Sequence, residues 1–249
     1  MAPVANRPEL AVWRAPLLGH TFDLEDLPVW LAGCDVHVEA IGEVYFLIIP
    51  VAVAGDSPEV VRAFVAAHLE IINGIGRVLD RSYRPVAPGP ALYGVNAAGD
   101  VINTAIAISG VESREKAGSL RAEVGGISPQ DQCSGAAAPL IRAAASSGRA
   151  HDALVILGRS HLTWSELYVL YELVNADAKR QKFKLGWIGK ADDDSFRQTV
   201  NSYTALRTQG RHGKDSGTPP IVPMTRDAAS RLISELVRAW LRQIGTNSC

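Results

Sequence analysis

The feature that most limits the fold of this chain is a run of six apolar residues, 44–49. Alternate side chains of a strand point to opposite faces of its sheet, so a strand that is apolar throughout predicts burial on both faces. Before it, residues 36–40 alternate apolar and polar side chains, and Gly42 lies at the centre of the short segment between them. The sequence therefore predicts a β-hairpin inside a covered sheet.

The rest of the first half predicts a small α+β unit. Ser57 and Pro58 are a typical helix start, and an apolar stripe follows as far as Leu79. A shorter helix is expected at 22–31, and a second hairpin at 91–95 and 101–108 around the turn 96–100. We expect residues 1–17, which contain three prolines before Leu17, to form an irregular arm.

The second half predicts helices. Thr163 and Glu166 have the spacing of a capping box, and Thr225 precedes a last amphipathic helix. An alanine-rich run at 135–147 predicts a further helix, whereas residues 150–157 fit a helix or another buried segment. The fold class is therefore α+β: an N-terminal domain of antiparallel hairpins and helices at 1–127, and an all-helical bundle at 128–249.

The net charge of −1 gives no overall attraction to nucleic acid or to membranes, but one segment is basic. Residues 179–214 hold nine basic and three acidic residues, with aromatic residues between them. This pattern fits a face that binds a polyanion, and it equally fits a solvated helix–loop–helix. If the face binds RNA, Lys182 and Lys184 are its candidate contacts.

Several classes of protein are disfavoured. The three cysteines, Cys34, Cys133 and Cys249, are far apart and predict neither a disulfide framework nor a zinc site. No cluster has metal-ligand spacing and no cofactor motif is present, so we expect neither a metal nor a cofactor. The longest apolar run is too short to span a bilayer and no secretory signal is recognisable, which predicts a cytoplasmic location without membrane association.

Residues 196–213 are the strongest candidate for a site. Three apolar side chains fall on one helical face, Phe196, Val200 and Tyr203, and Arg207 continues the stripe. Gly210 and Gly213 then bracket Arg211 and His212, which predicts one helix running into a turn. The alternative is structural: Arg207 closes a salt bridge and His212 is a solvated turn residue.

The last ninety or so residues resemble a group of uncharacterised bacterial two-part proteins. The resemblance rests on the Trp164 to Glu172 segment, the Phe196 to Ser202 segment, the Arg211-His212-Gly213 turn, the proline-rich loop after it, and a last helix containing Trp240. It implies a C-terminal helical domain but no particular activity.

A second resemblance, to HEPN domains, has functional content. Arg207 and His212 are separated by four residues, as in the Arg-x4–6-His motif of these all-helical modules of toxins and phage-defence ribonucleases. The resemblance implies metal-independent cleavage of single-stranded RNA in a site composed across a homodimer. Arg207 would hold the scissile phosphate and His212 would transfer the proton, with Arg211 and Asn201 assisting.

The competing hypothesis is a non-catalytic interaction protein. In this interpretation the α+β domain is joined to a bundle that binds RNA or a protein partner through residues 179–214. It predicts salt-sensitive binding without turnover, lost on charge reversal at Lys182 and Lys184.

Overall fold

The structure is a computed structural model that describes residues 9–106, 134–209, 214–215, 220 and 222–247. The chain forms two compact units. The sheet unit comprises residues 1–69 and 86–138, and the helical unit comprises residues 70–85 and 139–249. The domain boundary expected between residues 127 and 128 lies outside the described residues.

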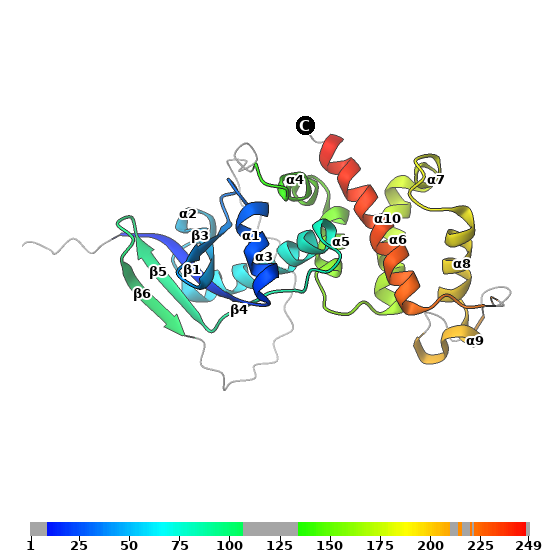
Figure 1. Cartoon of the computed structure of the whole chain (residues 1–249), viewed down its shortest axis with the longest axis horizontal. Helices are drawn as coiled ribbons and strands as arrows, with labels where there is room; N and C mark the ends of the chain where they lie inside the picture. The colour runs from blue at the N-terminus through cyan, green and yellow to red at the C-terminus, as the bar shows by residue number, and fades with distance from the viewer. Residues whose placement is uncertain (1–8, 107–133, 210–213, 216–219, 221, 248–249) are drawn as a thin grey trace, which may run out of the picture. The chain divides into compact units, whose positions relative to one another are not determined.

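The sheet unit contains an antiparallel sheet, as predicted. In the described part of the chain its strands are β1 Leu10–Leu18, β2 His37–Ile41, β3 Val44–Pro50, β4 Ala87–Pro88, β5 Ala91–Asn96 and β6 Val101–Ile106. Their order is β2-β3-β1-β5-β6, and β4 pairs with the end of β1 (Figure 1). Leu47, Ile48 and Ile49 are consecutive and all buried, so β3 is covered on both faces, as its apolar run predicts.

The central strand, β1, lies where an irregular arm was expected. The prediction for residues 1–17 is therefore wrong from Leu10 onward. Trp13, Ala15 and Leu17 are buried at alternate positions, a strand signal that the surrounding prolines obscure. Pro16 is tolerated near the strand end, where its carbonyl accepts a hydrogen bond from the Gly89 amide at 2.7 Å.

Helices join these strands. They are α1 Thr21–Trp30, α2 Val51–Ala54 and α3 Pro58–Leu79. The indole of Trp13 donates to the Gly55 carbonyl at 3.0 Å, which ties the chain after α2 to β1. Residues of α3 as far as Leu69 belong to the sheet unit, and those from Glu70 onward belong to the helical unit.

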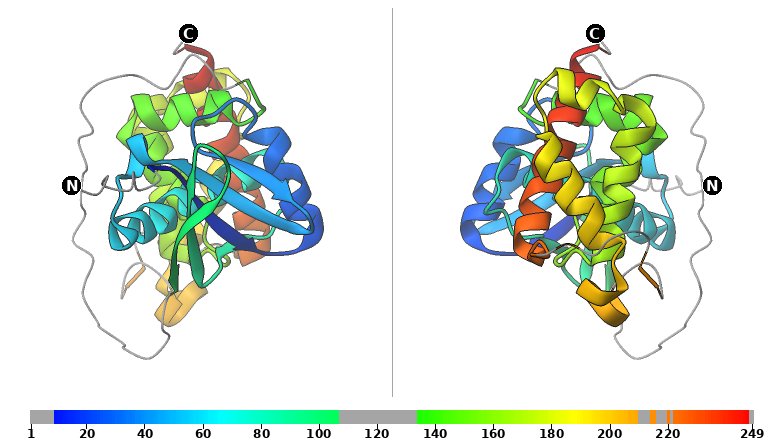
Figure 2. Two further views of the ribbon diagram at one scale, coloured as in Figure 1. Left: turned by 90° about the vertical axis from the view of Figure 1, so that its left-hand side faces the viewer. Right: turned by 90° about the vertical axis from the view of Figure 1, so that its right-hand side faces the viewer.

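The helical unit contains, besides the end of α3, the helices α4 Ala138–Ser146, α5 Gly148–Leu157, α6 Trp164–Ala178, α7 Gln181–Lys184, α8 Lys190–Val200, α9 Tyr203–Leu206 and α10 Arg226–Asn247. The predicted capping box opens α6, where the Thr163 hydroxyl accepts from the Glu166 amide and the Glu166 carboxylate accepts from the Thr163 amide. α10 lies along α6, and α8 lies beside this pair in Figure 1 and in the right-hand view of Figure 2.

The prediction of one helix from residue 196 to 206 is wrong, because α8 ends at Val200. Ser202 caps α9 instead: its hydroxyl accepts from the Ala205 amide at 3.1 Å and donates to Asp215 at 2.7 Å. Phe196 and Val200 are buried as expected, whereas Tyr203 begins a new helix off that stripe. A serine that can cap a helix competes with continuing the previous one.

Two further observations bear on the sequence predictions. Cys34 is disulfide-bonded. The cysteine spacing predicts no disulfide framework, and it does not show which cysteines a fold brings together. Cys133 and Cys249 lie outside the described residues. None of the helices described here has the length and apolar character that crossing a bilayer requires.

Candidate functional site

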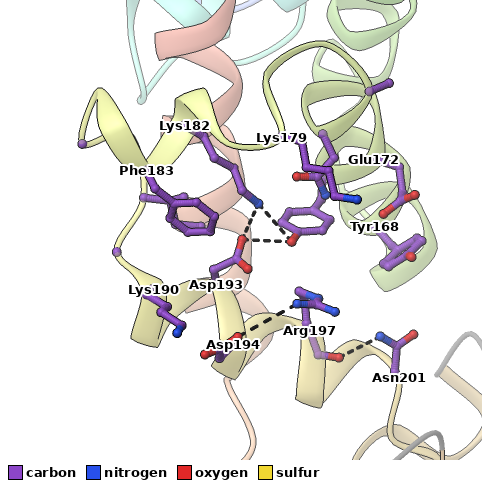
Figure 3. A pocket seen from close by; sticks show the side chains of 16 residues that line it. Tyr168, Glu172, Lys179, Lys182, Phe183, Lys190, Asp193, Asp194, Arg197 and Asn201 are labelled. Atoms are coloured by element: carbon purple, nitrogen blue, oxygen red, sulfur yellow. Dashed lines mark hydrogen bonds and ion pairs between the residues drawn. The ribbon is translucent and has the colours of Figure 1, made fainter.

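An open pocket of about 1250 Å³ lies between α6, α7 and α8 of the helical unit. We call it the α6–α8 pocket (Figure 3). Its lining is Tyr168, Tyr171, Glu172, Asn175, Ala176, Lys179, Lys182, Phe183, Gly186, Ile188, Gly189, Lys190, Asp193, Asp194, Arg197 and Asn201. α6 supplies one wall, α7 and the loop after it a second, and α8 a third.

Three exposed cations lie around this pocket. Lys179 follows α6, Lys190 begins α8, and Arg197 is two turns further along α8. The carboxylate of Asp194 lies 4.0 Å from Arg197, but both side chains are about half exposed, so the attraction is weak. With Glu172 as the other acidic side chain near the opening, the exposed lining keeps a small positive surplus.

Aromatic rings form part of the same lining. Phe183 on α7 lies on the wall of the pocket and is 41% exposed, so its ring is accessible to a ligand. Tyr168 on α6 lies half-buried, with its ring 6.2 Å from that of Tyr171. The pocket therefore offers both positive charge and π faces to a ligand.

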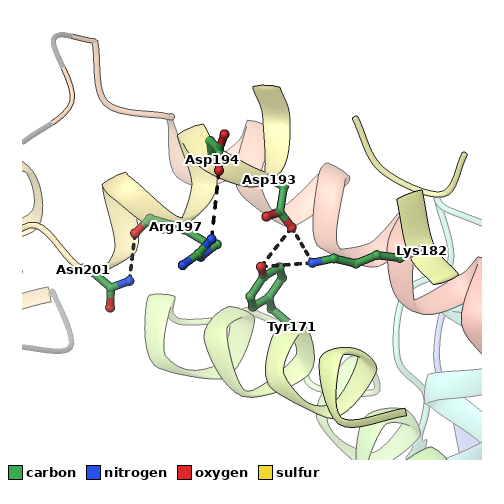
Figure 4. A network of polar contacts seen from close by, with 6 residues as sticks. All are labelled: Tyr171, Lys182, Asp193, Asp194, Arg197 and Asn201. Atoms are coloured by element: carbon green, nitrogen blue, oxygen red, sulfur yellow. Dashed lines mark hydrogen bonds and ion pairs between the residues drawn. The ribbon is translucent and has the colours of Figure 1, made fainter. Parts of the chain in front are cut away.

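Three buried polar side chains form the floor of the pocket (Figure 4). The Lys182 ammonium is ion-paired with the Asp193 carboxylate and donates to the Tyr171 hydroxyl at 3.0 Å. Tyr171 in turn donates to Asp193 at 2.9 Å. Each charge is thus neutralised inside the cluster, and the three residues join α6, α7 and α8.

The three side chains of this floor together carry no net charge, and their contacts hold them in place. Burial, together with the Asp193 carboxylate, raises the pKa of Tyr171, so its phenol remains a donor throughout the physiological range. The Lys182 ammonium also lies 4.2 Å from the centre of the Tyr171 ring and 4.9 Å from that of Phe183. The cluster therefore positions the aromatic wall and does not present a free charge.

The predicted contact residues are placed differently from one another. Lys182 and Asn201 both line the α6–α8 pocket, Lys182 in the floor and Asn201 at the end of α8, where its side-chain amide donates to the Arg197 carbonyl at 2.9 Å. Lys184 is exposed on α7 and does not line the pocket. Because Lys182 is buried, charge reversal there would disrupt the interior and would not probe a surface.

The predicted catalytic residues are described only in part. Arg207 is exposed at the start of a 3₁₀ turn, Arg207–Gln209, with its guanidinium 5.8 Å from the centre of the Tyr203 ring. No carboxylate in the described part of the chain pairs with it. Arg211 and His212 lie outside the described residues.

The backbone at Arg207 is unusual. Its φ of 51° and ψ of −124° place it in a region that L-residues rarely occupy. Among the described residues it is the one non-glycine position with positive φ. Beyond the turn, the Asp215 carboxylate accepts from the amide of Thr204 at 3.0 Å, which ties the returning chain to the first turn of α9.

Sequence reasoning missed much of this site. In the sequence, Lys179, Lys190 and Arg197 contribute to the charge of the basic segment 179–214, but nothing marks them as a group. Side chains from three helices form the floor, and no periodic pattern within one helix signals such a contact. In the part of the chain that the structure describes, no group of His, Cys, Asp and Glu is arranged to hold a metal ion.

Comparisons of the chain with protein-family models, with curated proteins and with solved structures gave no match.

Proposed function

We propose that the helical unit binds single-stranded RNA at the α6–α8 pocket. One observation carries the proposal: exposed Lys179, Lys190 and Arg197 surround the same open pocket as the rings of Tyr168 and Phe183. Proteins that bind single-stranded nucleic acid combine a positive groove along the phosphates with aromatic rings on which bases stack.

The charge of the surrounding segment supports a polyanionic ligand. Residues 179–214 carry a formal surplus of six positive charges in a chain whose total is −1. Pairing between Lys182 and Asp193 removes one charge of each sign, so the surplus of the remaining residues is unchanged. Long-range attraction of this kind steers a polyanion to one face of a protein that is nearly neutral overall.

The first test is charge reversal at the opening of the pocket. The double substitution Lys179→Glu and Lys190→Glu is expected to weaken binding of a fluorescein-labelled single-stranded RNA at least tenfold and to flatten its salt dependence, since two phosphate contacts are lost. Fluorescence anisotropy at several salt concentrations measures both. Arg226→Glu with Arg242→Glu on α10 makes the same change of net charge away from the pocket and is expected to bind within about twofold of wild type.

The contribution of base stacking is tested in the same assay. Phe183→Ala removes an exposed ring without altering charge, and stacking of one base is worth about 1–3 kcal/mol. Weaker binding with an unchanged salt slope supports the proposed pocket. Equal affinities for the charge-reversed pair, its control and wild type would refute it.

Metal-independent RNA cleavage by Arg207 and His212 is a second candidate. The strained backbone of Arg207 favours it, because such conformations are concentrated at functional sites, where the surroundings enforce them. In this mechanism His212 removes the proton from a 2′-hydroxyl, and the oxygen attacks the adjacent phosphorus while Arg207 binds the phosphate oxygens. The bond to the 5′-oxygen breaks and that oxygen takes up the proton, leaving a 2′,3′-cyclic phosphate and a 5′-hydroxyl.

This candidate predicts cleavage that persists in EDTA. His212→Ala is expected to reduce the rate by about 10²–10⁴-fold, the usual contribution of a general acid–base, and Arg207→Ala to reduce it strongly as well. Gel analysis of a labelled oligoribonucleotide gives the rate and the product ends. His161→Ala, at an exposed histidine of the loop before α6, serves as the control. If the His212→Ala variant still cleaves the RNA at the wild-type rate, His212 is not the catalytic residue and this candidate is refuted.

A further inference from the structure

A second pocket of the helical unit is lined by arginines. Its volume is about 130 Å³, and its charged lining consists of Arg77, Arg81, Arg231, Arg238 and Glu235. Ser230, Ser234, Leu157 and Leu162 complete the lining. We call it the arginine pocket; it shares no lining residue with the α6–α8 pocket.

Helical geometry explains why the cations gather. Arg231, Glu235 and Arg238 are at i, i+4 and i+7 of α10 and therefore share one face of that helix. Arg77 lies in the last turn of α3, and Arg81 follows that helix closely. A direct hydrogen bond joins the two helices, since the Arg238 guanidinium donates to the Arg77 carbonyl.

The charges within this pocket are not balanced. Four guanidinium groups face one carboxylate, Glu235, which already pairs with Arg81 at 2.8 Å. Asp80 attracts Arg238, but its carboxylate is occupied by the amide and hydroxyl of Ser82. Burial and the neighbouring cations Arg81 and Arg242 lower the pKa of Arg238, as expected where like charges are held together.

Donor groups are also left over. The Nε of Arg77 is buried and has no hydrogen-bond partner among the described residues. The same guanidinium donates through another nitrogen to the Ser160 carbonyl at 3.2 Å. Arg231 is exposed and makes no ion pair within the described part of the chain. An oxyanion in the pocket would supply the missing acceptors and the missing negative charge.

We propose that the arginine pocket binds a phosphate group. A guanidinium fits a tetrahedral oxyanion with two parallel hydrogen bonds, and several of them around one anion give a strong, geometrically specific site. The volume of 130 Å³ is well below that of pockets that enclose whole drug-sized ligands, so the pocket accepts a phosphate group and not an entire nucleotide. The proposal does not depend on RNA binding at the α6–α8 pocket, because different residues are involved.

Calorimetric titration of the full chain with inorganic phosphate, in chloride buffer at constant ionic strength, tests this proposal. Wild type is expected to bind one phosphate saturably. Arg231→Gln is expected to bind roughly tenfold more weakly, because a charge-assisted hydrogen bond is lost, and Arg81→Gln with Arg231→Gln to bind undetectably. Arg226→Gln, an exposed arginine at the start of the same helix and outside the pocket, is the matched control and is expected to bind like wild type.

A thermal readout makes the result independent of variant stability. Phosphate is expected to raise the melting temperature of wild type and of Arg226→Gln but not of the double variant, because only a folded state with the site is stabilised by the ligand. Absence of saturable binding to wild type, or undiminished binding to the double variant, overturns the proposal. Titration with uridine 5′-monophosphate distinguishes the two sources of the phosphate group: tighter binding than that of inorganic phosphate identifies a phosphomonoester, and weaker binding identifies free phosphate. Uridine, which lacks the phosphate, is the control for binding by the nucleoside alone.

Discussion

Asp193→Ala is expected to destabilise the helical unit by about 3–5 kcal/mol, the usual cost of removing one partner of a buried ion pair. The Lys182 ammonium would remain almost fully buried without a counter-charge, since its side chain is 2% exposed. The Tyr171 hydroxyl would also lose its acceptor. Urea denaturation followed by circular dichroism measures the change, which should be seen as a lower transition midpoint.

The neighbouring aspartate provides the control. Asp194 has the same charge and lies on the same helix, but it is 46% exposed and only weakly paired, so Asp194→Ala is expected to change stability by less than about 1 kcal/mol. The paired replacement Lys182→Met with Asp193→Leu should recover most of the loss, because apolar substitutes for a buried ion pair are often neutral or stabilising. Equal destabilisation by the two single variants would contradict the buried pair.

Gly74→Ala is the second substitution expected to have a large effect. A Cβ atom at this position would lie 2.1 Å from the carbonyl oxygen of Leu154, so α3 and α5 meet backbone to backbone there. Since main-chain atoms cannot rotate away, the helices must separate, and overpacking of this kind costs about 1–3 kcal/mol. The same substitution in an open helix interior stabilises by about 1 kcal/mol, so the sign of the change is informative.

Gly148 tests that reasoning on another helix of the same unit. A Cβ there meets nothing within 4 Å, so Gly148→Ala is expected to be neutral or slightly stabilising. Thermal unfolding of the two variants beside wild type compares them directly. If Gly74→Ala melts at or above the temperature of wild type, the close approach of α3 and α5 is incorrect.

Local patterns in the sequence predicted the fold class well. The capping box of α6, the start of α3 and the two hairpins all depend on residues near one another in the chain, and each formed as expected. β1 was missed because the alternation of apolar side chains is short and the prolines at positions 8 and 16 favour an irregular segment. The break after Val200 was missed because helical periodicity does not show where Ser202 finds its partner, Asp215.

The candidate site could be predicted less well than the fold. Lys182 carries the same charge in the sequence as Lys184, yet one is buried against Asp193 and the other is exposed. Only the packing of three helices distinguishes them. The arginine pocket was likewise missed, because Arg77 and Arg238 are far apart in the chain and neither belongs to the basic segment 179–214.

The discontinuous path of the helical unit has a practical consequence for dissecting the protein. Residues 70–85 belong to it although they precede β4, β5 and β6 of the sheet unit. A fragment that begins at residue 139 would therefore lack Gly74 at the contact with α5 and two arginines of the arginine pocket. A single cut in the chain therefore cannot separate the two units without also removing part of one of them. The properties of either unit are best measured on the intact chain.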